Sequence, residues 1–378
     1  MIQSLPEHLI SSRASGDEVT SFLDRHCFPI VEDSRVTFVY HGQADQVVLR
    51  HWIYGLPSRI PLSPLGSTGL WYRVLEFPAA SRIEYKFGVT RNGYEEWVHD
   101  PLNPDIAPDP FGGNSVVRTT GCEIPSWTLP REDVPAGRLE RLQIESQAFG
   151  ETREVQVYLP ARFHTYRRYR LLIVHDGTDY RRYSSMQTVL DNLIEALEIP
   201  PLVVAFSDPG KRLNEYADDP AHSRHLVEEL IPALEAQYPL ITEPTGRFLM
   251  GASFGAVAAL AAAWRHPGVF DSLLLQSGSF AFTDIGDHSR SPAFDRVVEF
   301  MNALRRQPGD LPSRIFVSCG VYESLIYENR SLVPFLQSQG VRVRYAEARD
   351  GHNWENWRDR LRDGLSWLCP GPLWVTYM

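Results

Sequence analysis

Cysteines and long apolar runs are scarce in this chain of 378 residues. The four cysteines, Cys27, Cys122, Cys319 and Cys369, lie far apart and lack the spacing of metal ligands, so no metal site is expected. No stretch approaches the roughly 18 uncharged apolar residues of a membrane span. The first residues contain no basic segment followed by an apolar core, so we expect no signal peptide. A reducing cytoplasm is the simplest location that these features predict.

Basic charge is also in short supply. Lysine and arginine together number 37 against 47 aspartates and glutamates, and only Lys86 and Lys211 are lysines. The resulting net charge of −10 argues against a nucleic-acid partner, because phosphate binding needs a basic field. Hydrophobic content of 43% and charged content of 22% are ordinary for a globular protein long enough for two or three domains. The oligomeric state is not fixed by the sequence.

The pattern of residues changes near the middle of the chain. A short helix is expected near 15–25, and four β-branched and aromatic runs then follow, separated by Gly and Pro, at 36–40, 46–53, 70–77 and 82–89. Short strands with turn signals and no long helix predict a β-sandwich. Residues 100–138 are rich in Pro, Asp and Gly and predict loops and a linker.

After residue 139, apolar strand candidates alternate with helical periodicity. The expected strands are 154–159, 169–174, 202–206, 247–250, 272–276, 314–318 and 341–345. The expected helices lie near 184–198, 222–237, 254–265, 292–305, 325–338 and 354–368. This alternation predicts an α/β fold, doubly wound, with a mostly parallel sheet covered by helices on both faces. Such sheets bind ligands outside the carboxyl ends of their strands.

Gly251-Ala-Ser-Phe-Gly255 reads G-x-S-x-G between an expected strand and an expected helix. A tight turn with small residues in that setting exposes the hydroxyl of Ser253, which predicts the nucleophile of a serine hydrolase. The alternative is an ordinary glycine turn before a core helix. The nucleophile also needs a base, an acid and donors for an oxyanion.

The base is expected on the loop after the last strand. Three histidines follow the serine, and His352 lies on a glycine-containing loop before the final helix. His266 lies at the end of the helix that follows the serine, and His288 lies in a polar loop. The position of His352 is the one that this fold reserves for the base, and the alternative is an exposed residue at a helix start.

The acid is expected after the strand 314–318, where Glu323 stands in the right loop to orient the imidazole. Glu328 competes with it and is expected to be helical already, whereas Asp350 is too close to His352 in sequence to reach round the ring. A surface carboxylate at a helix start is the alternative for Glu323.

Two backbone N–H groups are expected to stabilise the oxyanion. One belongs to Phe254, directly after the nucleophile. The other is assigned to Thr178, after the turn in His-Asp-Gly177, with Asp179 as the alternative. A plain turn at a strand end would produce the same pattern.

These motifs together resemble the esterase-D-like group of α/β-hydrolases, and the whole chain resembles its enterochelin esterase branch. The segments that carry the resemblance are Glu84-Tyr-Lys-Phe-Gly, Asp100-Pro-Leu-Asn-Pro, His175-Asp-Gly, Arg212-Leu-Asn-Glu-Tyr216, Gly251–Gly255, Gly320-Val-Tyr-Glu323 and Gly351-His-Asn-Trp-Glu-Asn-Trp357. The resemblance implies an immunoglobulin-like β-domain ahead of an α/β-hydrolase domain. The resulting ranges are an N-terminal extension over 1–30, the β-domain over 31–125, a linker over 126–138 and the hydrolase domain over 139–378.

The resemblance also implies the chemistry: hydrolysis of carboxylic esters through an acyl-enzyme on Ser253, with His352 and Glu323 and without metal or cofactor. Enterochelin esterases open the trilactone of a ferric catecholate siderophore in the cytoplasm, which implies a small-molecule ester as partner and neither nucleic acid nor membrane. An anionic substrate favours a basic rim. The rim candidates are Arg181, Arg182, Lys211, Arg212 and Tyr216, and the charged ones are equally compatible with a solvated surface.

Three other functions stay open. Relatives of this group cleave feruloyl or acetyl esters on polysaccharides, and an acyltransferase of the same fold would have the same motifs. A glycan-binding module on an inactive scaffold is the third, with Trp52, Trp71, Trp97 and Tyr94 as a sugar platform. Aromatic residues of this kind more often form the core of a sandwich.

Overall fold

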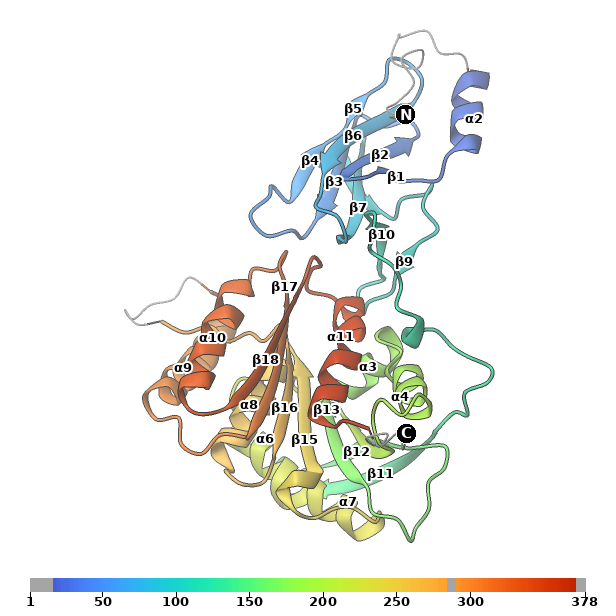
Figure 1. Ribbon diagram of the computed structural model, residues 1–378. Coiled ribbons are helices and arrows are strands. Elements are labelled where there is room, and N and C mark those ends of the chain that lie inside the picture. The colour runs from blue at the N-terminus through green and yellow to red at the C-terminus, as the bar shows by residue number, and fades with distance from the viewer. Residues whose placement is uncertain (1–15, 284–289, 372–378) are drawn as a thin grey trace. The chain divides into compact units, whose positions relative to one another are not determined.

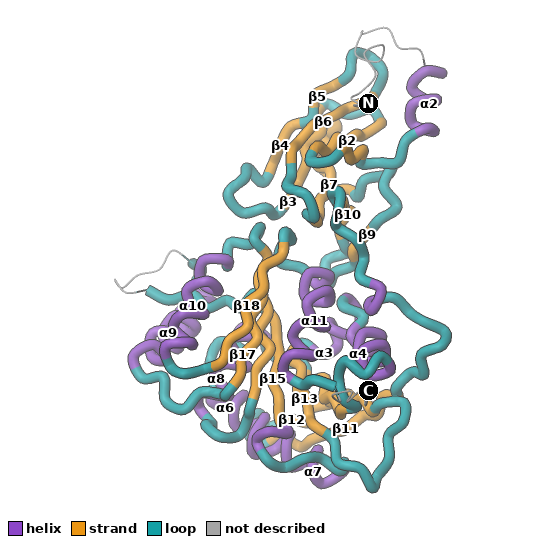
Figure 2. Tube along the Cα trace, viewed as in Figure 1, coloured by secondary structure: helices purple, strands orange, loops and turns teal. Residues whose placement is uncertain are grey.

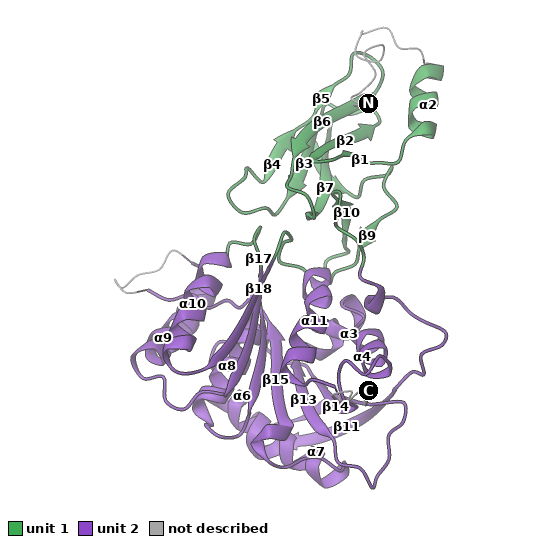
Figure 3. Cartoon of the chain, in the orientation of Figure 1, with its two compact units in different colours: residues 1–124, 320–324, 348–353 green, residues 125–319, 325–347, 354–378 purple. Residues whose placement is uncertain are grey.

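The computed structural model describes residues 16–283 and 290–371, which divide into two compact units (Figure 3). Unit 1 holds the chain up to Ile124 and two short segments from the C-terminal third, Gly320–Ser324 and Ala348–Asn353. Unit 2 holds Pro125–Cys319, Leu325–Glu347 and the chain from Trp354 onward. Both short segments of unit 1 fall inside the range 139–378 that the sequence assigns to the hydrolase domain.

The described residues of unit 1 form one helix and two β-sheets. The helix is α2 (Gly16–Arg25). One sheet has the order β1 (Ile30–Glu32), β2 (Arg35–His41), β6 (Leu70–Glu76), β5 (Ser63–Pro64). The other has the order β4 (Arg59–Pro61), β3 (Gln46–His51), β7 (Arg82–Arg91), β10 (Asn114–Arg118), β9 (Ile106–Ala107), with β8 (Tyr94–Val98) paired to β7.

The two sheets of unit 1 share one aromatic core. Phe38 of β2 meets Tyr85 of β7 edge to face at 4.9 Å between ring centroids, and Tyr40 meets Phe87 in the same way at 5.7 Å. These side chains come from alternate positions of their strands, as expected when one face of each sheet is buried. The Tyr85 hydroxyl donates a hydrogen bond to Asp100 Oδ2 at 2.6 Å. Burial raises the pKa of Asp100 to about 6.

Unit 2 is built on an eight-stranded sheet. Its order is β11 (Arg138–Ser146), β12 (Glu151–Leu159), β14 (Leu202–Ser207), β13 (Arg170–His175), β15 (Arg247–Ala252), β16 (Ser272–Gln276), β17 (Arg314–Gly320), β18 (Arg342–Ala348). The pairs β11–β12 and β12–β14 are antiparallel, and the pairs from β14 through β17 are parallel. The expectation of a mostly parallel sheet is therefore confirmed.

Helices cover both faces of this sheet (Figures 1 and 2). The α-helices are α3 (Gly177–Tyr183), α4 (Met186–Glu195), α5 (Arg212–Glu215), α6 (Pro220–Arg224), α7 (Ile231–Gln237), α8 (Phe254–Arg265), α9 (Asp295–Arg306), α10 (Ile326–Ser338) and α11 (Trp354–Leu368). A π-helical segment, η2 (His225–Leu230), joins α6 to α7, and η1 (Ser126–Thr128), η3 (Pro244–Gly246) and η4 (Pro292–Phe294) are 3₁₀ turns. In the part of the chain that is described, no helix is long and apolar enough to cross a membrane.

Strand β15 shows how the layers are joined. Leu249 packs into a cluster with residues of α8, α9 and α10, whereas the next residue, Met250, packs into a cluster with α3, α4 and α11. Successive side chains of a strand point to opposite faces, so a strand buried on both faces reads as a continuous apolar run. Pairing places Ala252 opposite Gln276, and Gln276 opposite Ser318. The carboxyl ends of β15, β16 and β17 therefore meet at one edge of the sheet.

Candidate active site

Ser253 occupies a strained turn between β15 and α8. Its φ of 57° and ψ of −122° lie where a residue with a Cβ costs about 1–3 kcal/mol. The turn is very tight, since a Cβ added to Gly251 would come within 2.4 Å of the backbone carbon of Gly255. The Ser253 N–H donates to Gln276 O at 2.9 Å, and Ser253 Oγ lies 3.2 Å from Ser279 Oγ. The turn thus fixes the hydroxyl at the carboxyl edge of the sheet.

His352 and Glu323 form a close pair within unit 1. Nδ1 of His352 lies 2.6 Å from Oε2 of Glu323, whose side chain is 1% exposed. The other carboxylate oxygen of Glu323 accepts the N–H of Gly320 at 2.7 Å. Because Nδ1 faces a carboxylate, Nδ1 carries the proton and Nε2 is left as the proton acceptor. The histidine side chain is 38% exposed, as a base that meets a substrate must be.

The other candidates for base and acid have different partners. Glu328 forms an ion pair with Arg290, and Asp350 forms one with Arg82 at 3.2 Å. His266 follows the last residue of α8, at the opposite end of that helix from Ser253. His288 lies outside the described residues.

The backbone N–H of Thr178 is already donated in this structure. It bonds to Asp208 Oδ1 at 2.9 Å, and the Thr178 hydroxyl donates to Asp208 Oδ2 at 2.5 Å. The expectation that this N–H faces an oxyanion therefore needs correction, because in the first turn of α3 the carboxylate of Asp208 accepts it. Phe254, in contrast, is the first residue of α8, and the first N–H groups of a helix have no acceptor within the helix. Its ring is buried against Phe294.

Tyr216 is a core residue and not a residue of a binding rim. It is 0% exposed, and its hydroxyl accepts the backbone N–H of Asp176 at 3.0 Å. Arg212 holds the same aspartate with two hydrogen bonds of 2.8 and 2.7 Å. The family resemblance alone placed the segment Arg212–Tyr216 near the substrate. The motif does not show whether its tyrosine is buried, because burial depends on the tertiary fold.

The remaining rim cations divide into two kinds. Arg181 donates to the side chain of Gln156 and lies over the ring of Phe206, 5.9 Å from its centroid. Arg182 and Lys211 are exposed. The side chain of Arg212, although bonded to Asp176, is also 38% exposed.

A buried histidine pair behind the serine turn was not expected from the sequence. Nε2 of His175 lies 2.9 Å from Nε2 of His222, and Nδ1 of His175 lies 3.0 Å from Met250 O. A carbonyl oxygen only accepts, so Nδ1 of His175 carries the proton and the N–H of His222 is the donor between the rings. Burial lowers the pKa of His175 to about 4, which keeps the pair neutral. A Cβ on Gly255 would lie 3.2 Å from His175 Cβ, so the pair supports the turn directly.

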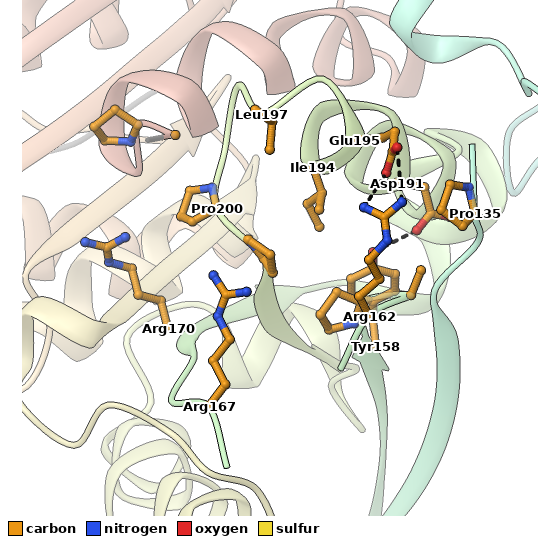
Figure 4. A pocket seen from close by; sticks show the side chains of 15 residues that line it. Pro135, Tyr158, Arg162, Arg167, Arg170, Asp191, Ile194, Glu195, Leu197 and Pro200 are labelled. Atoms are coloured by element: carbon orange, nitrogen blue, oxygen red, sulfur yellow. Dashed lines mark hydrogen bonds and ion pairs between the residues drawn. The ribbon is translucent and has the colours of Figure 1, made fainter. Parts of the chain in front are cut away.

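Across residues 16–283 and 290–371, no group of three or more His, Cys, Asp or Glu side chains could hold a metal ion. A cavity of about 380 Å³ lies elsewhere in unit 2 (Figure 4). Arg170, one of its lining residues, begins β13, and Arg162 on its wall pairs with Glu195 at 3.1 Å. The cavity is therefore at the amino edge of the sheet, away from Ser253.

Three of the four aromatic residues considered as a sugar platform are exposed. Trp52, Tyr94 and Trp97 are 52%, 74% and 51% exposed, and Arg50 lies 4.7 Å from the centroid of the Trp97 ring. The expectation that they belong to the core is wrong, because the core takes its aromatic residues from the inner faces of the sheets. Trp71 is partly buried and packs against that core.

Comparisons with known proteins agree with this geometry. The family described as "Putative esterase" matches residues 146–368. The uncharacterised protein YjcH of Bacillus subtilis (strain 168) is 28% identical over 148 residues, which are 37% of this chain and 62% of that protein. The iron(III) enterobactin esterase of Dickeya dadantii (strain 3937) is 27% identical over 243 residues, which are 62% of this chain and 56% of the relative. The chain thus spans less than two thirds of either relative.

Solved structures resemble a longer part of the chain. The enterobactin esterase from Shigella flexneri, in the presence of enterobactin, has a TM-score of 0.74 at 20% identity, covering 92% of this chain and 97% of that one. A ferulic acid esterase from Anaeromyces mucronatus has a TM-score of 0.52 at 15% identity, covering 64% and 94%. At these identities the likeness shows a shared fold, which is of the α/β-hydrolase type, and the resemblance to the enterochelin esterase branch is confirmed.

Proposed function

Because the chain belongs to the esterase family whose pattern spans residues 146–368, we propose that it is a serine carboxylic-ester hydrolase that works through an acyl-enzyme. The observation that carries the proposal is the strained turn that holds Ser253 between β15 and α8. Strain at such a position persists only where the surroundings enforce it, and it is typical of functional sites.

We assign the catalytic triad to Ser253, His352 and Glu323. The order of the strands supports this assignment, since β15 and β17 flank β16 and all three are parallel. Ser253 follows the carboxyl end of the first, and Glu323 follows the carboxyl end of the last by three residues. The 2.6 Å contact between Glu323 and His352 supplies the orienting acid that the chain order Ser, Glu, His requires.

The reaction follows from these roles. Ser253 Oγ attacks the ester carbonyl while Nε2 of His352 takes its proton, and Glu323 stabilises the imidazolium that forms. The N–H of Phe254 donates to the oxyanion. His352 then protonates the leaving alcohol. Water attacks the acyl-enzyme by the same route in reverse, releasing the acid and free Ser253.

The substrate that we propose is the trilactone of a catecholate siderophore, with its bound iron as cargo and the cytoplasm as the compartment. Support comes from the extent of the structural match, which reaches 92% of the chain for an enterobactin esterase and 64% for a ferulic acid esterase. A match over 92% of the chain extends beyond unit 2 into unit 1. We assign the β strands of unit 1 to an immunoglobulin-like domain over 31–125, after an extension over 1–30. A linker over 126–138 and the hydrolase domain over 139–378 complete this division. The exposed Arg182 and Lys211 suit an anionic ligand.

A feruloyl or acetyl ester is the second candidate substrate, and the likeness to a ferulic acid esterase favours it. An acyltransferase would share the acyl-enzyme and differ only in the acceptor. A glycan-binding role for the exposed Trp52 and Trp97 would accompany the polysaccharide-linked esters.

A hydrolysis panel tests the proposal. The purified chain is offered a ferric catecholate trilactone, the same trilactone without iron, a feruloyl ester and p-nitrophenyl acetate, with and without an added alcohol. We expect the trilactone to have the highest kcat/KM and water to be the acceptor. Ser253→Ala is expected to lower kcat by about 10³-fold or more on every ester. Full activity of that variant would refute a serine esterase, and a preference for the feruloyl ester would refute the siderophore assignment.

A further inference from the structure

The loops that carry the proposed acid and base belong to unit 1, although they follow strands of the large sheet (Figure 3). Gly320–Ser324 contains Glu323, and Ala348–Asn353 contains His352. Two neighbouring residues, Ser81 directly before β7 and Arg82 at its start, hydrogen-bond to these loops.

Arg82 hydrogen-bonds to the base loop, Ala348–Asn353, on both sides of His352. Its Nη1 donates to Oδ1 of Asp350 at 3.2 Å and to Oδ1 of Asn353 at 3.0 Å. Its backbone N–H donates to Arg349 O at 2.9 Å. Gly351 and His352 are thus enclosed between residues that one guanidinium holds.

Asp350 connects the Arg82 guanidinium to the backbone of the loop that carries His352. The same Oδ1 that faces Arg82 also accepts the N–H of Gly351 at 2.7 Å and the side-chain N–H of Asn353 at 2.8 Å. The carbonyl oxygen of Asp350 accepts the N–H of Tyr322 at 3.1 Å. The base loop is therefore bonded to the acid loop one residue before Glu323.

The acid loop has its own anchors in unit 1. The hydroxyl of Tyr322 lies 2.6 Å from Ser81 Oγ, and Tyr322 O accepts the N–H of Tyr54 at 2.8 Å. Residues 81 and 82 thus hold the two loops side by side, and the 2.6 Å contact between Glu323 and His352 spans them.

Burial makes the Arg82 cluster costly to break. The side chains of Arg82, Glu84 and Asp350 are 2%, 10% and 8% exposed, so the guanidinium faces both carboxylates with little water around them. Burial raises the pKa of Glu84, which the neighbouring guanidinium opposes. Removing Arg82 would take a cation away from both carboxylates, and the charge of Asp350 would then favour a loop arrangement that brings it closer to water.

We propose that Arg82 is a positioning residue that sets the orientation of the His352 imidazole through Asp350 and Asn353. The proposal rests on the proposed function, in which His352 is the base. A misplacement of a catalytic group by about 1 Å costs on the order of 10²-fold in rate. Arg82 lies about 270 positions before His352 in the chain, so tertiary contacts alone bring it to the base loop.

The test compares Arg82→Met and Arg82→Lys with Arg50→Met, a matched variant that breaks the Arg50–Glu95 ion pair of the same unit. We expect Arg82→Met to lower kcat on p-nitrophenyl acetate about 10²-fold with little change in KM, Arg82→Lys to recover part of the loss, and Arg50→Met to leave kcat unchanged. Asp350→Asn adds a double-mutant cycle, in which the double variant is expected to be no slower than Arg82→Met alone.

Two measurements keep the proposal separate from simple unfolding and from the proposed function. Circular dichroism reports whether each variant is folded, and the NMR resonances of the His352 imidazole report its surroundings. If folded Arg82→Met keeps the parental kcat, or if its His352 resonances match those of Arg50→Met, the positioning role is overturned. If Ser253→Ala keeps its activity, the proposed function falls, and the His352 resonances still decide the role of Arg82.

Discussion

At the scale of single residues, Gly251 is required by the closeness of the backbone at Gly255. Gly251→Ala places a Cβ against the backbone of Gly255, which has no side chain that could move aside. We expect a loss of about 1–3 kcal/mol in the free energy of unfolding and a large loss of esterase activity. Urea unfolding and fluorophosphonate labelling of Ser253 measure the two effects. Gly16→Ala is the control, because nothing lies within 4 Å of a Cβ at that position.

Tyr216→Phe separates a core role from a substrate role. The change leaves the buried N–H of Asp176 without its acceptor, at a cost of about 1–3 kcal/mol. We expect a lower melting temperature and an unchanged KM for every ester. A raised KM together with an unchanged melting temperature would instead support the prediction that Tyr216 contacts the substrate.

The sequence predicts which residues are candidates for the site better than it predicts their hydrogen-bond partners. Ser253, Glu323 and His352 were placed by motif and strand order, and the structure brings the last two into contact. The partner of Thr178 was missed because Asp208 belongs to the end of another strand. The pairing of His175 with His222 joins residues 47 positions apart, and no local pattern marks it.

At the scale of elements, α8 depends on small side chains. Ala259 is 0% exposed in the cluster that joins α8 to the sheet. Ala259→Leu is therefore expected to cost about 1–3 kcal/mol through overpacking. Ala236→Leu, at an exposed position of α7, is expected to stay within about 0.5 kcal/mol of the parent. Equal melting temperatures for the two variants would contradict this account of the packing.

The apolar strands of unit 2 were predictable because both faces are buried, which gives each a continuous apolar run. The edge strand β11 was missed because its burial alternates and its exposed positions carry charge. The single helix expected near 222–237 is divided into α6, η2 and α7. Its apolar spacing does not distinguish an α-turn from a π-turn, since tertiary packing decides between them.

At the scale of the whole molecule, the two units are expected to respond to pH in opposite directions. In unit 1 the pKa of Asp100 rises from 3.8 to about 6, so the folded state binds its proton more tightly. That contribution is full below pH 3.8 and is lost as the pH rises toward 6. In unit 2 the pKa of His175 falls from 6.5 to about 4, so the folded state favours the neutral ring. That contribution is full above pH 6.5 and is lost as the pH falls toward 4.

Each of these shifts corresponds to on the order of 3 kcal/mol. Hydrogen exchange resolved by unit, measured between pH 4 and pH 7, checks the prediction. Asp100→Asn is expected to flatten the pH dependence of unit 1, and His175→Gln that of unit 2. Parallel pH profiles for both units would contradict the assignment of the two groups.

The division of the chain into units was the least predictable feature. Composition separates a β-rich first part from an alternating second part, yet the segments that carry Glu323 and His352 join the first. Membership of a compact unit depends on contacts such as Arg82 with Asp350, which link residues 268 positions apart. No periodicity or turn signal encodes a pairing over that distance.

The hydrogen bonds of Ser81 and Arg82 to the two loops limit how the sequence can diverge and how the β-unit can be exchanged between relatives. A β-unit that holds the loops of Glu323 and His352 is not a detachable accessory, so we expect residues 81 and 82 to change together with Tyr322, Asp350 and Asn353 during divergence. A chimaera that takes its N-terminal unit from a relative would inherit foreign anchors for these two loops. Compatible grafts are therefore those that carry both loops along with the strands that hold them.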